Sequence, residues 1–217
     1  MEMFEKIEML ISLAVTGGAL AALFLGVVSS GEAWAGDGKK QETAVATFAG
    51  GCFWCMEPAF DKLSGVISTT VGYTGGEKKN PTYEEVCSGT TGHAEAIQVE
   101  FDPNRVTFQE VLEVFWRNID PTTPNRQFCD VGTQYRTAVF YHDDTQRRIA
   151  EETKKEIEER LNHVAATEIV AASTFYSAEE YHQDFYKKNP DHYTKYRRGC
   201  GRDERLDELW GKPSDAD

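Results

Sequence analysis

The sequence predicts a single α+β domain in which a mixed or antiparallel β-sheet packs against helices. Short β-rich segments with alternating apolar residues are interleaved with segments of helical spacing, without the strict β-α-β rhythm of a parallel fold. About 180 residues follow an apolar N-terminal stretch, which is enough for one domain with a sizeable core. The sequence contains no internal repeat that would favour a solenoid.

Five segments have the alternation and the β-branched or aromatic content of strands. They are residues 42–48, 66–73, 94–101, 135–141 and 167–172. Glycine and proline mark the connections at Thr74–Pro81 and Ser88–Gly92, and the polar stretch 120–132 is also predicted to be a loop. Tyr83–Cys87 is too short to assign.

Segments of helical spacing follow four of these strands. The predicted helices are residues 55–63, 107–118, 144–161, with Asp143 or Asp144 as its cap, and 177–188. Ser177-Ala178-Glu179-Glu180 resembles a capping box, and Asn189-Pro190 ends the last of these helices. The charged residues of 144–161 form a solvated face. From Asp191 we expect an irregular tail, apart from a helix over 202–209.

The N-terminus has the pattern of an export signal. Met9–Val28 is apolar apart from Ser12, Thr16 and glycines, and Ala33-Trp34-Ala35 is an A-x-A cleavage pattern. We expect cleavage after Ala35, with a retained membrane anchor over residues 1–35 as the alternative, because the apolar run is long enough to span a bilayer. Either way the protein is expected to be periplasmic or otherwise exported.

The predicted organisation is therefore a signal peptide or anchor over 1–35, a disordered lead-in over 36–42, a catalytic domain over 43–190 and a C-terminal tail over 191–217. The formal net charge is −13, which argues against a nucleic-acid or anionic-lipid partner. The five cysteines are an odd number, so at least one thiol in an exported protein stays unpaired or reactive.

Gly50-Gly51-Cys52-Phe53-Trp54-Cys55 is the most informative stretch of the chain. It places Cys52 between a strand and a helix, where the helix N-terminus favours a thiolate, and the two aromatics offer an apolar wall. The C-x-x-C spacing also fits a thioredoxin-like redox pair or half of a zinc site. Zinc would need two further ligands, and no histidine has paired spacing with Cys87 or Cys129, so we expect no metal.

Three further residues could assist a reactive cysteine. Glu95 shares one face of the predicted strand 94–101 with apolar residues, so burial would raise its pKa and suit it to act as an acid. Tyr83 and Tyr135 could donate hydrogen bonds to a substrate oxygen. Taken singly, Glu95 is more simply interpreted as an exposed strand-end glutamate, and Tyr83 and Tyr135 as ordinary packed tyrosines.

Together these motifs resemble those of the A-type peptide methionine sulfoxide reductases. The matching segments occur in the family's order and cover about Ala44 to Pro190. They are Gly51-Cys52-Phe53-Trp54, Gly72-Tyr73-Thr74-Gly75-Gly76, Asn80-Pro81-Thr82-Tyr83, Cys87-Ser88-Gly89-Thr90-Thr91-Gly92-His93-Ala94-Glu95, Gly132-Thr133-Gln134-Tyr135-Arg136 and Tyr181-His182-Gln183.

The resemblance implies reduction of methionine-S-sulfoxide, free or in oxidised proteins, without a metal or organic cofactor, by an α/β sandwich that we expect to be a monomer. Cys52 would attack the sulfoxide sulfur and become a sulfenic acid. The implied assisting residues are Glu95 as the acid, Tyr83 and Tyr135 at the oxygen, Phe53 and Trp54 at the S-methyl group, and Asp130 lining the site. His93 and His182 are expected to be structural.

The resemblance leaves the resolving thiol open. Cys200, between Gly199 and Gly201 and near several arginines that favour a thiolate, is our first choice, and Cys55 is the alternative. Cys87 and Cys129 are interpreted as small packed residues. A thioredoxin, or a periplasmic thioredoxin-like protein if the chain is exported, would then reduce the disulfide.

Two other function classes remain as hypotheses. A general thiol–disulfide oxidoreductase would use Cys52 and Cys55 and would have no need of Glu95 or the tyrosines. A non-catalytic methionine- or peptide-binding module would keep its affinity without Cys52. Neither glycine pair is followed by a phosphate-binding pattern.

Overall fold

The computed structural model describes residues 42–212, which form a six-stranded mixed sheet in the order β7-β6-β1-β3-β2-β8. Neighbouring strands are antiparallel except β6 and β7, which are parallel. The sheet comprises β1 (Ala44–Gly50), β2 (Val66–Thr74), β3 (Ala94–Phe101), β6 (Thr137–Tyr141), β7 (Glu168–Ala171) and β8 (Tyr176–Ser177), and β4 (Arg126–Gln127) pairs with β5 (Asp130–Val131) in a separate hairpin. The predicted α+β class is confirmed.

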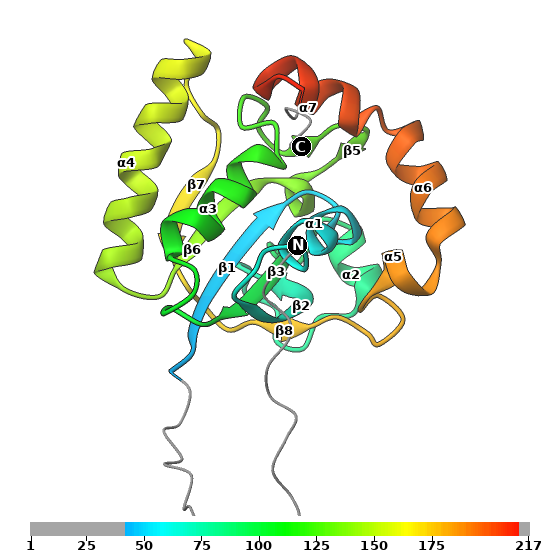
Figure 1. The fold of residues 1–217 in the computed structure, drawn as a ribbon. Helices are drawn as coiled ribbons and strands as arrows, with labels where there is room; N and C mark the ends of the chain where they lie inside the picture. The colour runs from blue at the N-terminus through cyan, green and yellow to red at the C-terminus, as the bar shows by residue number, and fades with distance from the viewer. Residues whose placement is uncertain (1–41, 213–217) are drawn as a thin grey trace, which may run out of the picture. The chain divides into compact units, whose positions relative to one another are not determined.

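Seven helices and one 3₁₀ turn accompany the strands within the described residues. They are α1 (Phe53–Phe60), α2 (Tyr83–Cys87), α3 (Phe108–Arg117), α4 (Asp144–Leu161), α5 (Phe185–Lys188), α6 (Pro190–Gly199), α7 (Arg202–Trp210) and the 3₁₀ turn Thr133–Tyr135. Helix α4 runs beside the β6–β7 edge of the sheet, whereas α5 and α6 lie on the opposite side of the fold (Figure 1). Tyr135 lies in the 3₁₀ turn before β6, whereas the sequence predicted that this strand begins at Tyr135.

The main core lies between the sheet and helices α1 and α3. Phe48 of β1 stacks on Phe60 of α1, with ring centroids 5.5 Å apart, and on Phe115 of α3 at 4.9 Å. Along β3, Ile97, Val99 and Phe101 belong to this core, whereas Ala94 and Ala96 face a smaller cluster on the other side. The alternation of the strand therefore turns Glu95 toward α1.

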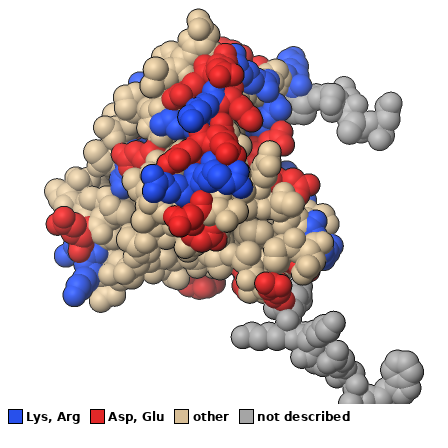
Figure 2. All heavy atoms as spheres, turned by 90° about the vertical axis from the view of Figure 1, so that its left-hand side faces the viewer, with Lys and Arg blue, Asp and Glu red and all other residues tan. Residues whose placement is uncertain are grey.

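Helix α4 is covered mainly by charged side chains, as its sequence predicts. The Asp143 carboxylate accepts a hydrogen bond from the Gln146 N–H and caps the helix. Ion pairs one turn apart join Arg147 to Glu151 and Arg148 to Glu152, and their side chains are about half exposed. Figure 2 shows acidic and basic side chains intermixed on this face, so it is a solvated surface rather than a binding patch of one sign.

The predicted helix over 177–188 is wrong for most of its length, since only α5 is helical. Its polar side chains are used in tertiary hydrogen bonds instead. The Gln183 side-chain amide pairs with both the N–H and the C=O of Val71, so it extends the edge of β2. The Glu179 carboxylate accepts from the Tyr73 hydroxyl and the Tyr83 N–H. These contacts outweigh local helix propensity.

The irregular tail predicted from Asp191 is also wrong. Pro190 occupies the first position of α6, where its missing N–H costs nothing, and Gly201 adopts φ +62° between α6 and α7. The predicted helix over 202–209 is confirmed as α7. Arg202 anchors α7 to the rest of the domain. Its buried guanidinium donates a hydrogen bond to the Asn118 carbonyl at 2.6 Å and stacks over the Phe128 ring.

The predicted signal or anchor over 1–35 lies outside the described residues, as does nearly all of the predicted lead-in. Within 42–212 no helix combines the length and apolarity needed to cross a bilayer. The export prediction is not addressed by the fold.

Replacing Arg202 should weaken the attachment of the C-terminal segment. We expect Arg202→Met to lower the free energy of unfolding by roughly 2–3 kcal/mol, because the buried Asn118 carbonyl loses its charged donor. Urea unfolding followed by tryptophan fluorescence measures the change. Arg198→Met, at an exposed position of α6, is the matched control and should differ from the wild type by less than about 0.5 kcal/mol. Equal losses in both variants would contradict this anchoring role.

Candidate active site

Cys52 lies where β1 ends and α1 begins, as predicted. It is the N-cap residue of α1 and is 6% exposed. Gly51, immediately before it, has φ +78°, and a Cβ there would lie 2.4 Å from the Gln127 Cβ. Any other residue would meet both the left-handed backbone and the wall formed by Gln127, so the glycine is required by the turn that presents the cysteine.

Glu95 reaches the same helix N-terminus from β3. Its Oε2 accepts a hydrogen bond from the Phe53 N–H at 3.1 Å, and the residue is 2% exposed. Burial raises the pKa of Glu95 to about 8, with smaller contributions from Asp130 and Cys55, although the Phe53 N–H opposes the rise. The carboxyl is thus mainly protonated at neutral pH, and the burial that the alternation predicts is confirmed.

The prediction that the helix end favours a Cys52 thiolate is wrong for this state. Burial raises the pKa of the Cys52 thiol well above its usual range, and the charges of Cys55 and Glu95 act in the same direction. The first N–H of α1, which could have held a thiolate, is bonded to Glu95. Desolvation therefore outweighs the helix dipole.

Cys55 is the more acidic thiol of the pair. A hydrogen bond from Cys52 lowers the pKa of Cys55 to about 7 against the opposing effect of burial, and the positive charges of Arg202 and Arg197 contribute. The arginines were expected to favour a thiolate at Cys200. Instead, the charges of Arg202 and Arg197 lower the pKa of Cys55, although Arg197 also pairs with Asp203.

The predicted oxygen ligands face the same space. Tyr83 and Tyr135 are half buried, and burial is the main cause that raises the pKa of each phenol. The charge of Glu95 contributes to both shifts, which links the two tyrosines electrostatically to the acid. Both phenols therefore remain protonated and able to donate hydrogen bonds.

Tyr196 of α6 belongs to the site and was missed from the sequence. Its hydroxyl donates a hydrogen bond to Asp130 Oδ2 and a second interaction joins it to Cys52. Burial raises the pKa of Asp130, and Tyr196 and Arg202 offset part of the rise. The available signal was its position four residues before Cys200, which puts both side chains on one face of a helix.

Trp54 forms a fixed aromatic wall beside the cysteines. Its indole stacks on Phe185 at 3.7 Å, and its Nε1–H donates to His182 Nδ1 at 2.9 Å. His182 is buried, so its ring is a structural hydrogen-bond acceptor, as expected. Phe53 is 1% exposed and packs against the Tyr73 ring and against His182, the hydrogen-bond partner of Trp54.

The pairing of Cys129 and Cys200 differs from the prediction. Cys200 is bonded to Cys129, with Cα atoms 4.8 Å apart, so interpreting Cys129 as a small packed residue was wrong. Cys52, Cys55 and Cys87 are free. Cys87 is half buried beside Tyr83. His93 is structural, since its ring bridges the Gly76 N–H and the Lys78 carbonyl.

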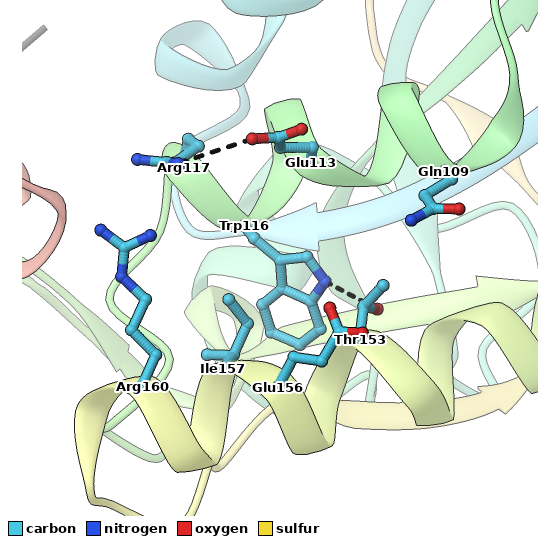
Figure 3. Close-up of a pocket in the computed structure, with 8 residues that line it drawn as sticks. All are labelled: Gln109, Glu113, Trp116, Arg117, Thr153, Glu156, Ile157 and Arg160. Carbon is cyan, nitrogen blue, oxygen red and sulfur yellow. Dashed lines mark hydrogen bonds and ion pairs between the residues drawn. The ribbon is translucent and has the colours of Figure 1, made fainter.

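One hollow of the described surface is separate from these residues. It lies between α3 and α4, where Trp116 donates to the Thr153 hydroxyl and Arg117 pairs with Glu113 (Figure 3). Its lining comes entirely from the two helices and includes no cysteine or histidine, so it is a packing groove with no catalytic group. The chemistry-bearing residues are gathered around Cys52.

A family described as "Peptide methionine sulfoxide reductase" matches residues 44–214. Among the most similar relatives, "Peptide methionine sulfoxide reductase MsrA" of Bacillus licheniformis is 52% identical over 177 residues, which cover 81% of this chain and 98% of the relative. The protein of the same description from Bacillus subtilis is 50% identical over 173 residues, with 79% and 98% covered.

Solved structures agree with these sequence matches. Reduced Mxr1 from Saccharomyces cerevisiae has a TM-score of 0.67 at 37% identity, with 69% of this chain and 87% of that chain covered. Methionine sulfoxide reductase A of Corynebacterium diphtheriae has a TM-score of 0.63 at 36% identity, with 68% and 76% covered.

The raised pKa of Glu95 predicts a pH-dependent difference in stability. Unfolded glutamate releases its proton near pH 4.3, whereas folded Glu95 keeps it to about pH 8, so unfolding releases a proton between these values and wild-type stability falls as pH rises. We expect Glu95→Gln to gain on the wild type by up to about 1 kcal/mol per pH unit across this window. Urea unfolding between pH 5 and 9 measures the difference. Glu156→Gln, at an exposed site of α4, is the control, and a pH-independent difference for Glu95→Gln would contradict the buried neutral acid.

Proposed function

The chain belongs to the peptide methionine sulfoxide reductase family, A type, and we propose how its residues reduce methionine-S-sulfoxide, free or in oxidised proteins, to methionine. The observation that carries the proposal is the pairing of a cysteine with a protonated acid. Cys52 and Glu95 meet at the N-terminus of α1, and the carboxyl has a pKa of about 8. A sulfoxide oxygen is a poor leaving group until it is protonated, and this acid can supply the proton.

Cys52 attacks the sulfoxide sulfur while Glu95 protonates the oxygen. The thiol proton of Cys52 passes to Cys55, which is its hydrogen-bond partner and has a pKa of about 7. Methionine departs as the thioether and Cys52 becomes a sulfenic acid, so the sulfoxide gains the two electrons that the cysteine sulfur loses. Tyr83 and Tyr135 donate hydrogen bonds to the oxygen in a water-poor site.

The substrate methyl group lies against Trp54, which Phe53 supports. The stacking on Phe185 and the hydrogen bond to His182 support a rigid indole face at this place. Asp130 orients Tyr196 toward Cys52 and does not itself bind the substrate.

Cys55 is the first thiol to condense with the sulfenic acid, releasing water and forming the Cys52–Cys55 disulfide. The Cys52–Cys55 hydrogen bond favours Cys55 over our first choice, Cys200, which is bonded elsewhere. We propose that a thioredoxin-like dithiol protein restores the thiols and, because the chain has an export pattern, that this donor is periplasmic.

A general disulfide oxidoreductase is a weaker explanation of the same residues. Cys52 and Cys55 are 6% and 2% exposed, so a protein disulfide could not reach them without a large opening. Such an enzyme also has no use for the buried acid. The burial therefore favours a small sulfoxide group as the substrate.

The first test is the loss of the nucleophile or the acid. Cys52→Ser should form no methionine above the enzyme-free background, and Glu95→Gln should slow the first turnover by about 10²–10⁴-fold. The assay follows methionine-S-sulfoxide with dithiothreitol as reductant. Glu100→Gln, on the same strand and outside the site, is the control and should turn over normally. Normal turnover by Cys52→Ser would refute the proposal.

The export proposal has a separate test. The mature protein, isolated from cells that express the full chain, should begin at Gly36 and be found outside the cytoplasm. N-terminal sequencing and cell fractionation measure these two properties. Recovery of the uncleaved chain with membranes would favour the anchor, whereas an uncleaved cytoplasmic protein would contradict export altogether.

A further inference from the structure

We propose that Tyr181 and Glu84 form a subsite at the mouth of the active site, and that this subsite binds a lysine or arginine side chain next to the methionine sulfoxide of a protein substrate. The proposal rests on the proposed function, because it names the class of oxidised peptide that the same site prefers. The reaction as described above uses neither of these two residues.

Tyr181 is connected to the aromatic wall of the site through a single intervening ring. The residue is 54% exposed, and its ring packs on His182 with the ring centroids 4.1 Å apart. The same buried imidazole accepts the hydrogen bond of the Trp54 indole at 2.9 Å and packs against Tyr83 at 4.4 Å. A peptide that places its sulfoxide methyl group against Trp54 therefore passes close to Tyr181.

Two carboxylates lie beside this ring, and the three residues Tyr181, Glu84 and Glu179 are called the rim below. Although burial opposes the change, hydrogen bonds from the Tyr73 hydroxyl and the Tyr83 N–H lower the pKa of Glu179, so its carboxylate is charged at neutral pH. Burial raises the pKa of Tyr181, and the charges of Glu179 and Glu84 act in the same direction, so both carboxylates lie near the phenol. The rim is therefore both aromatic and acidic.

Glu84 has no basic partner to neutralise it. It is exposed in the first turn of α2, and no lysine or arginine in the described part of the chain pairs with it. The neighbouring carboxylates differ, because Glu85 pairs with Lys78 at 2.9 Å and Glu180 pairs with Lys188 at 2.8 Å. The rim therefore keeps an unbalanced negative charge, which favours a cation as its ligand.

A buried polar atom also faces the rim. Burial lowers the pKa of His182, so its ring is neutral, and because Nδ1 accepts from Trp54 the single ring proton is on Nε2. This Nε2 lies 4.0 Å from Glu179 Oε2 and has no hydrogen-bond partner among the described residues. Buried donors are normally bonded, so this N–H points to an acceptor that the substrate brings, such as a backbone carbonyl beside the sulfoxide.

A lysine or arginine side chain fits the rim through two interactions. Its aliphatic stem and cationic head can stack on the exposed ring of Tyr181, and the head can pair with the carboxylate of Glu84. Each interaction is weak at an exposed site, so together they change the preference between peptides by about tenfold and do not decide whether the reaction occurs. N-acetylmethionine sulfoxide has no flanking side chain and gains nothing from the rim.

Two synthetic peptides test the subsite. They carry methionine-S-sulfoxide between two lysines or between two glutamates and are otherwise identical. With dithiothreitol as reductant, the wild-type kcat/KM should be about tenfold higher for the lysine peptide, and this ratio should fall toward unity in about 1 M salt, where the screening length is about 3 Å. The difference should lie mainly in KM, because the rim contacts a part of the peptide that does not react.

Variants locate the preference at the rim. Tyr181→Leu and Glu84→Gln should each lower the lysine-to-glutamate ratio at least about threefold, whereas Tyr181→Phe keeps the aromatic face and should retain most of the preference. Glu156→Gln removes the same charge from an exposed position of α4 and should leave the ratio unchanged. Because the measured quantity is a ratio within one variant, a general loss of activity or stability cancels.

Equal kcat/KM values of the wild type for the two peptides would overturn the subsite. So would a ratio that Tyr181→Leu and Glu84→Gln leave unchanged, or one that Glu156→Gln lowers equally, since the preference would then come from the net charge of the chain. N-acetylmethionine-S-sulfoxide tests the proposed function separately. Failure of the wild type to reduce this compound and both peptides would refute the reductase itself, whereas its reduction together with equal peptide values would refute the subsite alone.

Discussion

The hydrogen bond from the Phe53 N–H to Glu95 determines the arrangement of the site. It joins the centre of the sheet to the first turn of α1 and so holds the acid beside Cys52. Glu95 is buried deeply enough for its pKa to rise to about 8, while this single amide limits the rise. Because the carboxyl occupies the helix N-terminus, the same N–H cannot stabilise a thiolate, and Cys52 rests as a thiol.

The C-terminal segment contributes the positive charges that act on the two cysteines of the site. The N-terminal half of the domain supplies a neutral acid and a neutral nucleophile, whereas α6 and α7 bring the cations Arg197 and Arg202. Their charges favour the thiolate of Cys55, which can then accept the proton of Cys52. The site therefore depends on the attachment of α7, and Arg202 provides it by reaching back to the carbonyl of Asn118. The thiolate is therefore favoured at Cys55, by the arginines of the C-terminal segment, and not at Cys52, where the dipole of α1 was expected to favour it.

Local patterns predicted the parts of the fold that local forces determine. The alternation of β3 gave both the strand and the burial of Glu95, and Asp143 marked the start of α4. Residues 177–184 could not be predicted in this way, because Gln183 pairs with Val71 across 112 residues of sequence. Helix α6 was missed since none of its residues is buried and its sequence has no apolar stripe. The Cys129–Cys200 pairing, 71 residues apart, left no local signal either.

The burial of Cys52, Cys55 and Glu95 has two opposing consequences for the proposed reaction. In the proposed reaction, exclusion of water favours proton transfer from Glu95 to the sulfoxide oxygen, because the competing solvent is removed. The same exclusion keeps a protein reductant away from the oxidised Cys52. Cys52 and Cys55 are 6% and 2% exposed, whereas the bonded pair Cys129 and Cys200 lies nearer the surface, with Cys129 exposed. The burial that keeps Glu95 protonated therefore also places Cys52 and Cys55 out of reach of a large partner, unless the fold opens.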